Sequence, residues 1–121
     1  MTELLRFFLR KADRILKRPE FKAFSETARR LSTHFFIVLV APAKSGRSRI
    51  GITVSRKVGG AVERNRIKRL AREAFRLNRH LLDRPWDLIF IARRAAAEQP
   101  NWVIAKALKE IYDNLTRKLE N

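Results

Sequence analysis

Residues 49–78 read RIGITVSRKVGGAVERNRIKRLAREAFRLN, and the spacing of apolar side chains changes within this stretch. Ile50, Ile52 and Val54 alternate with small or polar residues, which is the two-residue period of a β-strand. After the glycine pair at 59–60, apolar residues recur at spacings of three and four, which predicts an amphipathic helix over residues 61–78. The apolar stripe of that helix consists of Ile67, Leu70, Ala71, Ala74 and Phe75.

Further elements are predicted on both sides of this stretch. The apolar run at 34–41 (HFFIVLVA), followed by a turn at 42–46, predicts an antiparallel hairpin with residues 49–55. Residues 28–33 indicate a short edge strand, and residues 86–92 (WDLIFIA) indicate another strand. Helices are expected over residues 19–27 and from Pro100 onward, since proline is favoured in a first helical turn.

The expected fold is therefore a single α+β domain over residues 1–121. It has two layers, a small mixed sheet of about four strands packed with about three helices. Residues 1–13 are a lead-in to which no element is assigned.

The charge of the chain points to a polyanionic partner. The sequence has 28 Lys and Arg against 12 Asp and Glu, a formal net charge of +16, which suits nucleic acid or an anionic membrane surface. No apolar run approaches the ~20 residues that a spanning helix needs, and the apolar N-terminal stretch is interrupted by Arg6. A nucleic acid is the expected partner, and a membrane is not. The absence of cysteine excludes disulfides and thiol nucleophiles.

The positive charge is concentrated between residues 56 and 79, where nine Lys and Arg stand against two Glu. On the predicted helix, basic side chains at spacings of three and four form a ridge opposite the apolar stripe. Like charges repel at these spacings, so the ridge favours an anion-binding function. Arginine binds phosphate oxygens bidentately, and the Asn65 amide could hydrogen-bond a phosphate, a 2′-hydroxyl or a hydrated metal ion. The candidate RNA-binding residues are Arg56, Lys57, Arg64, Asn65, Arg66, Lys68, Arg69, Arg72 and Arg76.

The chain shows no self-sufficient active site. His34 and His80 lie near no carboxylate at metal-ligand spacing, and Asp83 and Asp87 are explained by a turn and the entry to a strand. No catalytic residue is therefore assigned, and no metal site is expected in the protein alone.

Three segments, residues 49–57, 61–69 and 72–76, closely resemble the protein subunit of bacterial ribonuclease P. The triplet Arg64-Asn65-Arg66 matches the RNR motif of that family, and residues 87–93 resemble its last strand. The resemblance implies a left-handed crossover through the basic helix, whereas general packing rules favour a right-handed one.

The resemblance also implies a function. The protein would assist a catalytic RNA in the endonucleolytic removal of the 5′ leader from precursor tRNA, by phosphodiester hydrolysis, in the bacterial cytoplasm. Its partners would be ribonuclease P RNA and precursor tRNA, and not DNA. Magnesium or similar divalent ions would be held mainly by the RNA, with Asn65 as a candidate outer-shell contact. The protein would favour metal binding at the RNA active site but supply no catalytic group, and it would be inactive alone.

A cleft between the first helix and the exposed sheet face would, by the same resemblance, hold the single-stranded leader. Alternation places Phe36 and Val38 on one face of their strand and Phe35, Ile37 and Leu39 on the other, which is expected to be the core face. The family usually has two phenylalanines four residues apart in its first helix, whereas this chain has them three apart. The expected lining consists of Phe21, Phe24, Phe36 and Val38.

Three other functions are compatible with the charge. A ribosomal RNA-binding protein would share the basic helix but leaves the 49–76 motif unexplained. A toxin-type endoribonuclease would need reactive side chains, and the sole tyrosine, Tyr112, lies in the apolar stripe of the last helix. A DNA-binding helix-turn-helix lacks a second helix at the right spacing before Ala61.

Overall fold

The computed structural model describes residues 28–43, 46–82 and 84–120, with side chains as far as residue 116. The lead-in at 1–13 and the predicted helix at 19–27, including Phe21 and Phe24, lie outside the described residues. The described elements are, in chain order, β1 (Arg29–Ser32), β2 (Phe36–Pro42), β3 (Arg49–Thr53), α3 (Ala61–Asn78), the 3₁₀ turn η2 (Arg79–Leu81), β4 (Trp86–Ala92), α4 (Arg94–Ala97) and α5 (Asn101–Glu120).

The four strands form one mixed sheet in the order β1-β2-β4-β3. Strands β1 and β4 both pair antiparallel with β2, and β3 pairs parallel with β4. The predicted hairpin between residues 34–41 and 49–55 is therefore wrong, because β4 lies between these two strands. Strand β4 is buried at every position except Ile91, which suits an interior position, whereas β3 exposes Thr53 and lies at the edge.

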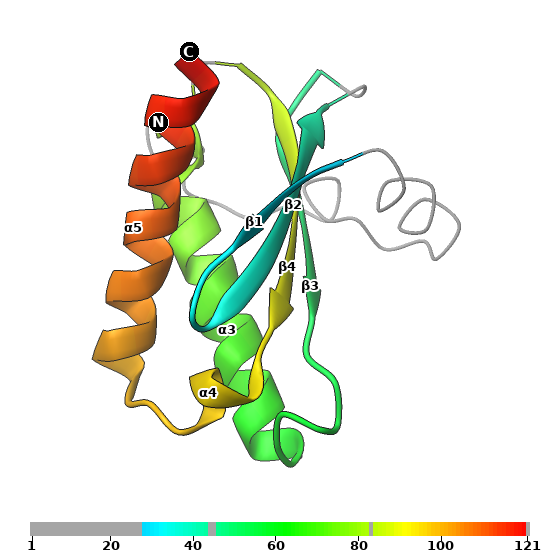
Figure 1. Ribbon diagram of the computed structural model, residues 1–121, viewed down its shortest axis with the longest axis vertical. Helices are drawn as coiled ribbons and strands as arrows, with labels where there is room; N and C mark the ends of the chain where they lie inside the picture. Colours follow the sequence, from blue (N-terminus) through cyan, green and yellow to red (C-terminus); the bar gives the residue numbers. More distant parts are fainter. Residues whose placement is uncertain (1–27, 44–45, 83, 121) are drawn as a thin grey trace, which may run out of the picture.

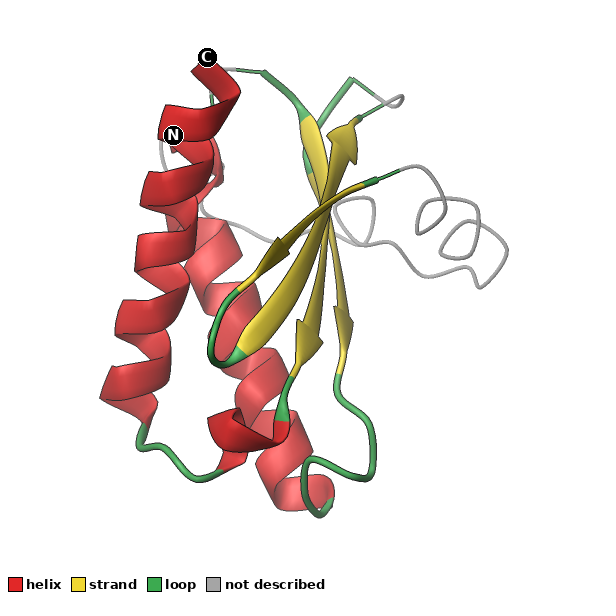
Figure 2. Ribbon diagram, in the orientation of Figure 1, coloured by secondary structure: helices red, strands yellow, loops and turns green. Residues whose placement is uncertain are grey.

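Helix α3 connects the parallel strands β3 and β4 by a left-handed crossover. In Figure 1 both strands run downward and β4 lies to the left of β3. Helix α3, which joins the end of β3 to the start of β4, lies behind the sheet. This confirms the unusual handedness that the family resemblance implied. Figure 2 shows α3 and α5 next to each other on the same face of the sheet, so the molecule has a helical layer and a sheet layer.

The main core lies between this helical layer and the sheet. The ring of Phe36 packs edge-on against Phe90 at 6.1 Å between centroids, and Phe90 lies 6.0 Å from the ring of Tyr112 on α5. Helix α5 buries its predicted stripe from Ile104 to Leu115, which confirms the helix predicted from Pro100 onward. The short helix α4, which follows β4, was not predicted.

The face assignment along β2 is wrong. The predicted alternation is present, but Phe36 and Val38 are fully buried in the main core and so cannot line an open cleft. Ile37 and Leu39 instead lie on the outer face, away from the helices, in a cluster with Ile89. Both sets of side chains are apolar, so the two-residue period separates them without showing which set meets the helices. Phe35, just before the strand, is half-buried against the main core.

No helix within the described ranges is long and apolar enough to cross a membrane.

Candidate RNA interface

Helix α3 separates an apolar face from a basic one. Its buried residues include Ile67, Ala71 and Phe75, which anchor the helix on the sheet. On the other side, Asn65 and Arg69 are exposed and their neighbours are partly exposed, as the amphipathic pattern predicts. We call this surface the basic face of α3, and it consists of Asn65, Lys68, Arg69, Arg72 and Arg76.

The loop between β3 and α3 adds further cations. Arg56 and Lys57 are exposed, while Val58 is buried and its amide donates a 3.0 Å hydrogen bond to the Ser55 carbonyl, which holds the loop against the domain. Gly59 permits a close approach to the helix, since a Cβ there would lie 3.1 Å from the Cβ of Glu63. The loop therefore presents two cations next to the first turn of α3.

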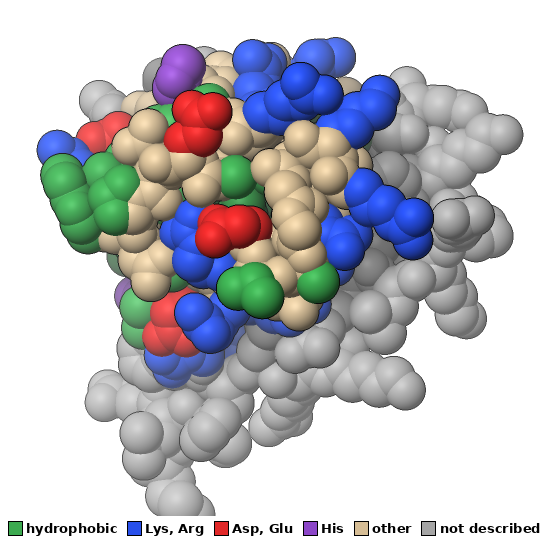
Figure 3. All heavy atoms as spheres, turned by 90° about the horizontal axis from the view of Figure 1, so that it is seen from below, with side chains coloured by type: hydrophobic (Ala, Val, Ile, Leu, Met, Phe, Trp, Pro, Cys, Tyr) green, Lys and Arg blue, Asp and Glu red, His purple; other side chains and the backbone are tan. Residues whose placement is uncertain are grey.

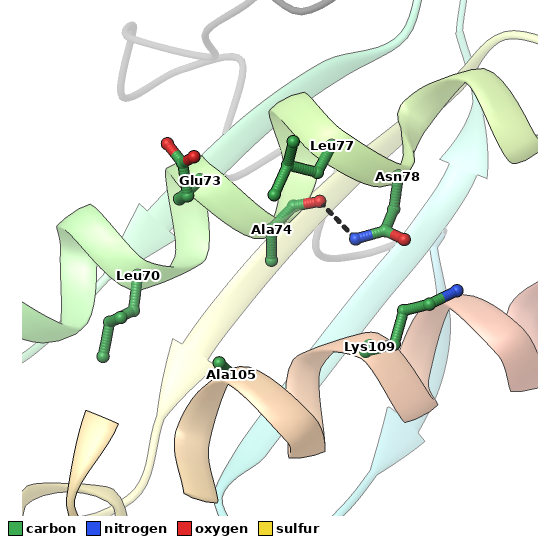
Figure 4. A pocket seen from close by; sticks show the side chains of 7 residues that line it. All are labelled: Leu70, Glu73, Ala74, Leu77, Asn78, Ala105 and Lys109. Atoms are coloured by element: carbon green, nitrogen blue, oxygen red, sulfur yellow. Dashed lines mark hydrogen bonds between the residues drawn. The ribbon is translucent and has the colours of Figure 1, made fainter. Parts of the chain in front are cut away.

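The parallel pairing of β3 and β4 brings two more arginines to this region. Because the carboxyl ends of parallel neighbours meet at one edge of a sheet, Arg93 and Arg94, directly after β4, lie at the same edge as Arg56 and Lys57. Both are exposed, and sequence reasoning did not include them in the site. Figure 3 views this end of the molecule, where Lys and Arg side chains cover much of the surface. The sequence signal that could have identified them is their place directly after the strand at 86–92, since the crossover that the resemblance implied brings the ends of the two strands together.

Arg66, the last residue of the RNR motif, makes its hydrogen bonds to other residues of the protein. Its Nε and Nη2 donate to Glu63 Oε2 at 3.1 and 2.8 Å, and its Nη1 donates to Asn101 Oδ1 at 2.8 Å. Nη2 also donates to the Ala97 carbonyl at 3.2 Å. The guanidinium thus ties α3 to α4 and α5, which is a positioning role within the protein, and the predicted RNA contact of Arg66 stays a prediction.

Two other arginines of α3 differ in their partners. Arg76 is ion-paired with Glu73, and this hydrogen bond lowers the pKa of the Glu73 carboxyl and raises the pKa of Arg76. Its charge is therefore partly compensated. Arg64 has a buried Nε without a hydrogen-bond partner among the described residues, although a buried donor is normally satisfied.

The described residues include no cluster of three or more His, Cys, Asp or Glu side chains that could hold a metal ion. Tyr112, on which a toxin-type mechanism would depend, is fully buried, and this burial raises the pKa of its hydroxyl well above the ordinary value. The sole tyrosine of the chain is therefore inaccessible to a substrate. The described surface, with its many cations, is suited to binding a polyanion.

Comparisons with known proteins agree with this geometry. The family model described as Ribonuclease P matches residues 9–116. The ribonuclease P protein component of Desulfatibacillum aliphaticivorans is 43% identical over 110 residues, covering 91% of this chain and 93% of that protein. The chain belongs to the ribonuclease P protein family. Members of this family are RNA-binding protein components of a tRNA-processing endoribonuclease, and this chain is accordingly a subunit of that type.

Solved structures of the ribonuclease P protein share the fold. The protein from Staphylococcus aureus has a TM-score of 0.79 and 33% identity, covering 85% of this chain and 94% of its own. The protein from Thermotoga maritima has a TM-score of 0.70 and 30% identity, covering 80% and 96%. The four-stranded mixed sheet with its helices is therefore the fold of ribonuclease P proteins.

Alanine substitutions at Arg66 and Arg69 should separate positioning from RNA binding in this ribonuclease P protein. Arg69→Ala removes an exposed cation. We therefore expect the negative slope of log affinity for RNA against log salt to become shallower by roughly 0.7–0.9, with the thermal midpoint unchanged. Arg66→Ala should instead lower the thermal midpoint and leave the slope nearly unchanged, because its charge is paired internally. RNA titrations at several salt concentrations and thermal melts measure both effects. Equal slope losses in the two variants would contradict the positioning role.

Proposed function

We propose that this protein binds the catalytic RNA of ribonuclease P through the basic face of α3 and the cations at the carboxyl edge of β3 and β4. The observation that carries the proposal is the concentration of exposed cations on two adjoining elements of a domain with net charge +16. Phosphate contacts from such a surface supply affinity and register without reading sequence. The chemistry of 5′-leader removal from precursor tRNA then belongs to the RNA, in the bacterial cytoplasm.

The 5′ leader has a candidate position on the outer face of the sheet. Ile37, Ile91 and Thr53 are register partners across β2, β4 and β3, and they form one row on that face. Thr53 is exposed and the two isoleucines are partly exposed, whereas Leu39 and Ile89, in the next row, are buried. The accessible row thus lies at the carboxyl edge of β3 and β4. A single strand there would meet apolar surface for its bases and nearby cations for its phosphates.

Divalent ions enter this proposal as ions of the RNA. The described side chains include no cage for a metal, but the Asn65 amide is exposed within the basic face of α3. It could hydrogen-bond a water of a magnesium ion held by RNA phosphates. Cations of the protein would favour such binding by reducing repulsion between RNA strands, and the ion would activate the attacking water.

Cleavage of precursor tRNA at low magnesium tests the function directly. We expect the protein alone to leave the substrate intact, and a bacterial ribonuclease P RNA with the protein to cleave at the mature 5′ end faster than the RNA alone. Robust cleavage by repurified, RNA-free protein would contradict the proposal and support the toxin-type alternative. An equal rate with and without protein would also contradict it.

A further inference from the structure

The end of the molecule formed by the first turns of α3 and α5 exposes two large apolar side chains. Val62 on α3 is 80% exposed and Trp102 on α5 is 70% exposed, and no other large hydrophobic among the described residues is as exposed. Figure 3 shows hydrophobic side chains at this end, with some charged side chains nearby. Tryptophan usually buries much of its surface, so an exposed ring needs an explanation.

The two turns are held together by the guanidinium of Arg66. Its hydrogen bond to Asn101, the residue before Trp102, fixes the first turn of α5 beside the first half of α3. Arg69 lies three residues after Arg66 and therefore on an adjoining part of the α3 surface, at the border of the basic face. Trp102 thus lies in the first turn of α5, at the end of the domain where Arg66 joins α5 to α3, the helix that carries the basic face.

A cation near Trp102 along α5 suits a nucleic acid partner. Lys106 is exposed one helical turn after Trp102, whereas Lys109, further along, is paired with Asp113 at 2.9 Å. The surface area of two isolated apolar side chains is much smaller than the roughly 800 Å² that each partner buries in a stable protein interface. A single exposed ring beside a cation is enough for one nucleobase, because aromatic side chains stack on bases of any sequence.

We propose that Trp102 is a stacking platform for an unpaired nucleobase of the ribonuclease P RNA, at a contact that adjoins the basic face of α3. This inference rests on the proposed function, and Arg66 acts in it as the positioning residue. The platform supplies stacking, while Arg69 and Lys106 supply charge for the adjoining phosphates.

The chain contains two tryptophans, which makes the ring a direct reporter. Trp86 is buried, so Trp86→Phe leaves Trp102 as the only tryptophan, whose fluorescence can be excited selectively over that of Tyr112, and circular dichroism checks that this variant is folded. We expect ribonuclease P RNA to quench the fluorescence and protect the ring from acrylamide, and an RNA duplex of equal length to do so far less. Equal quenching by the duplex, or protection that depends on protein concentration without RNA, would overturn the inference.

Affinity measurements complete the test. Trp102→Ala should weaken binding of ribonuclease P RNA by about fivefold to a hundredfold, with an unchanged salt slope because no charge is removed. Trp102→Phe should retain most of the affinity. Leu81→Ala is the matched control, since Leu81 is also exposed but lies on η2, beyond the opposite end of α3.

The outcomes distinguish this inference from the proposed function. Wild-type affinity of Trp102→Ala, while Arg69→Ala still lowers the salt slope, would overturn the platform and leave the proposed function standing. Failure of the unsubstituted protein to bind ribonuclease P RNA would overturn both.

Discussion

Phe36→Ala is expected to lower the free energy of unfolding by about 3–5 kcal/mol, because it empties a fully buried ring site at the centre of the main core. The ring lies between β2 and the helical layer and packs edge-on against Phe90. A loss of this size is a large part of the stability of a small domain, so the thermal midpoint should fall by about 10 °C or more. Urea unfolding followed by circular dichroism measures the change.

The neighbouring residue Ile37 is the matched control. It lies on the outer face of the same strand and is partly exposed, so Ile37→Ala should cost clearly less stability than Phe36→Ala. If Ile37→Ala were the more damaging change, the assignment of the two faces of β2 would be wrong. Binding of leader-bearing precursor tRNA is the complementary readout, since only Ile37 belongs to the proposed leader row.

Asp87→Ala should destabilise the protein by about 3–5 kcal/mol, because it removes the carboxylate that binds the Arg49 guanidinium through two hydrogen bonds on the outer face of the sheet. Arg49 donates from Nε to Asp87 Oδ1 at 3.1 Å and from Nη2 to Oδ2 at 2.8 Å. The side chains are 18% and 5% exposed, so water replaces little of the lost interaction. The two residues are also register partners of the parallel pair β3 and β4, and the ion pair therefore fastens the edge strand to the centre of the sheet.

The double variant Arg49→Met, Asp87→Leu tests the reason for this loss. Replacing both charges with apolar side chains of similar size removes the Arg49 charge together with its carboxylate, so stability should recover most of what Asp87→Ala loses. Chemical denaturation of the two variants side by side measures the difference. A double variant as unstable as Asp87→Ala would mean that Asp87 acts through something other than its pairing with Arg49.

The local elements were predictable because they depend on spacing along the chain. The change from a two-residue period to spacings of three and four at Gly59-Gly60 identified β3 and α3, and the basic ridge of α3 followed from the same geometry. The strand at 86–92 and the helix after Pro100 were also predicted, since each is a strongly patterned apolar segment. The resemblance to ribonuclease P proteins rested on those same residues.

The pairing of the strands, and the face of each strand that meets the helices, depended on contacts between segments that are distant in the sequence. A turn between two apolar runs predicts a hairpin. Strand β4, however, is the most buried strand, and it buries more apolar surface by lying between β2 and β3. The alternation in β2 shows two sets of side chains, and only the position of the helical layer decides that Phe36 and Val38 face inward. The same layer decides that Arg66 binds Asn101, 35 residues away, because α5 lies beside α3.

The sequence by itself therefore determined the four strands, the helices α3 and α5, the basic face of α3 and the family, all of which follow from residues close together in the chain. Only the tertiary structure decided the strand order, the inward face of β2, the gathering of Arg56, Lys57, Arg93 and Arg94 at one edge, and the hydrogen bond from Arg66 to Asn101. The physical reason is that periodicity reports how a segment is divided into faces, whereas the neighbour that covers each face is chosen by burial summed over the whole domain.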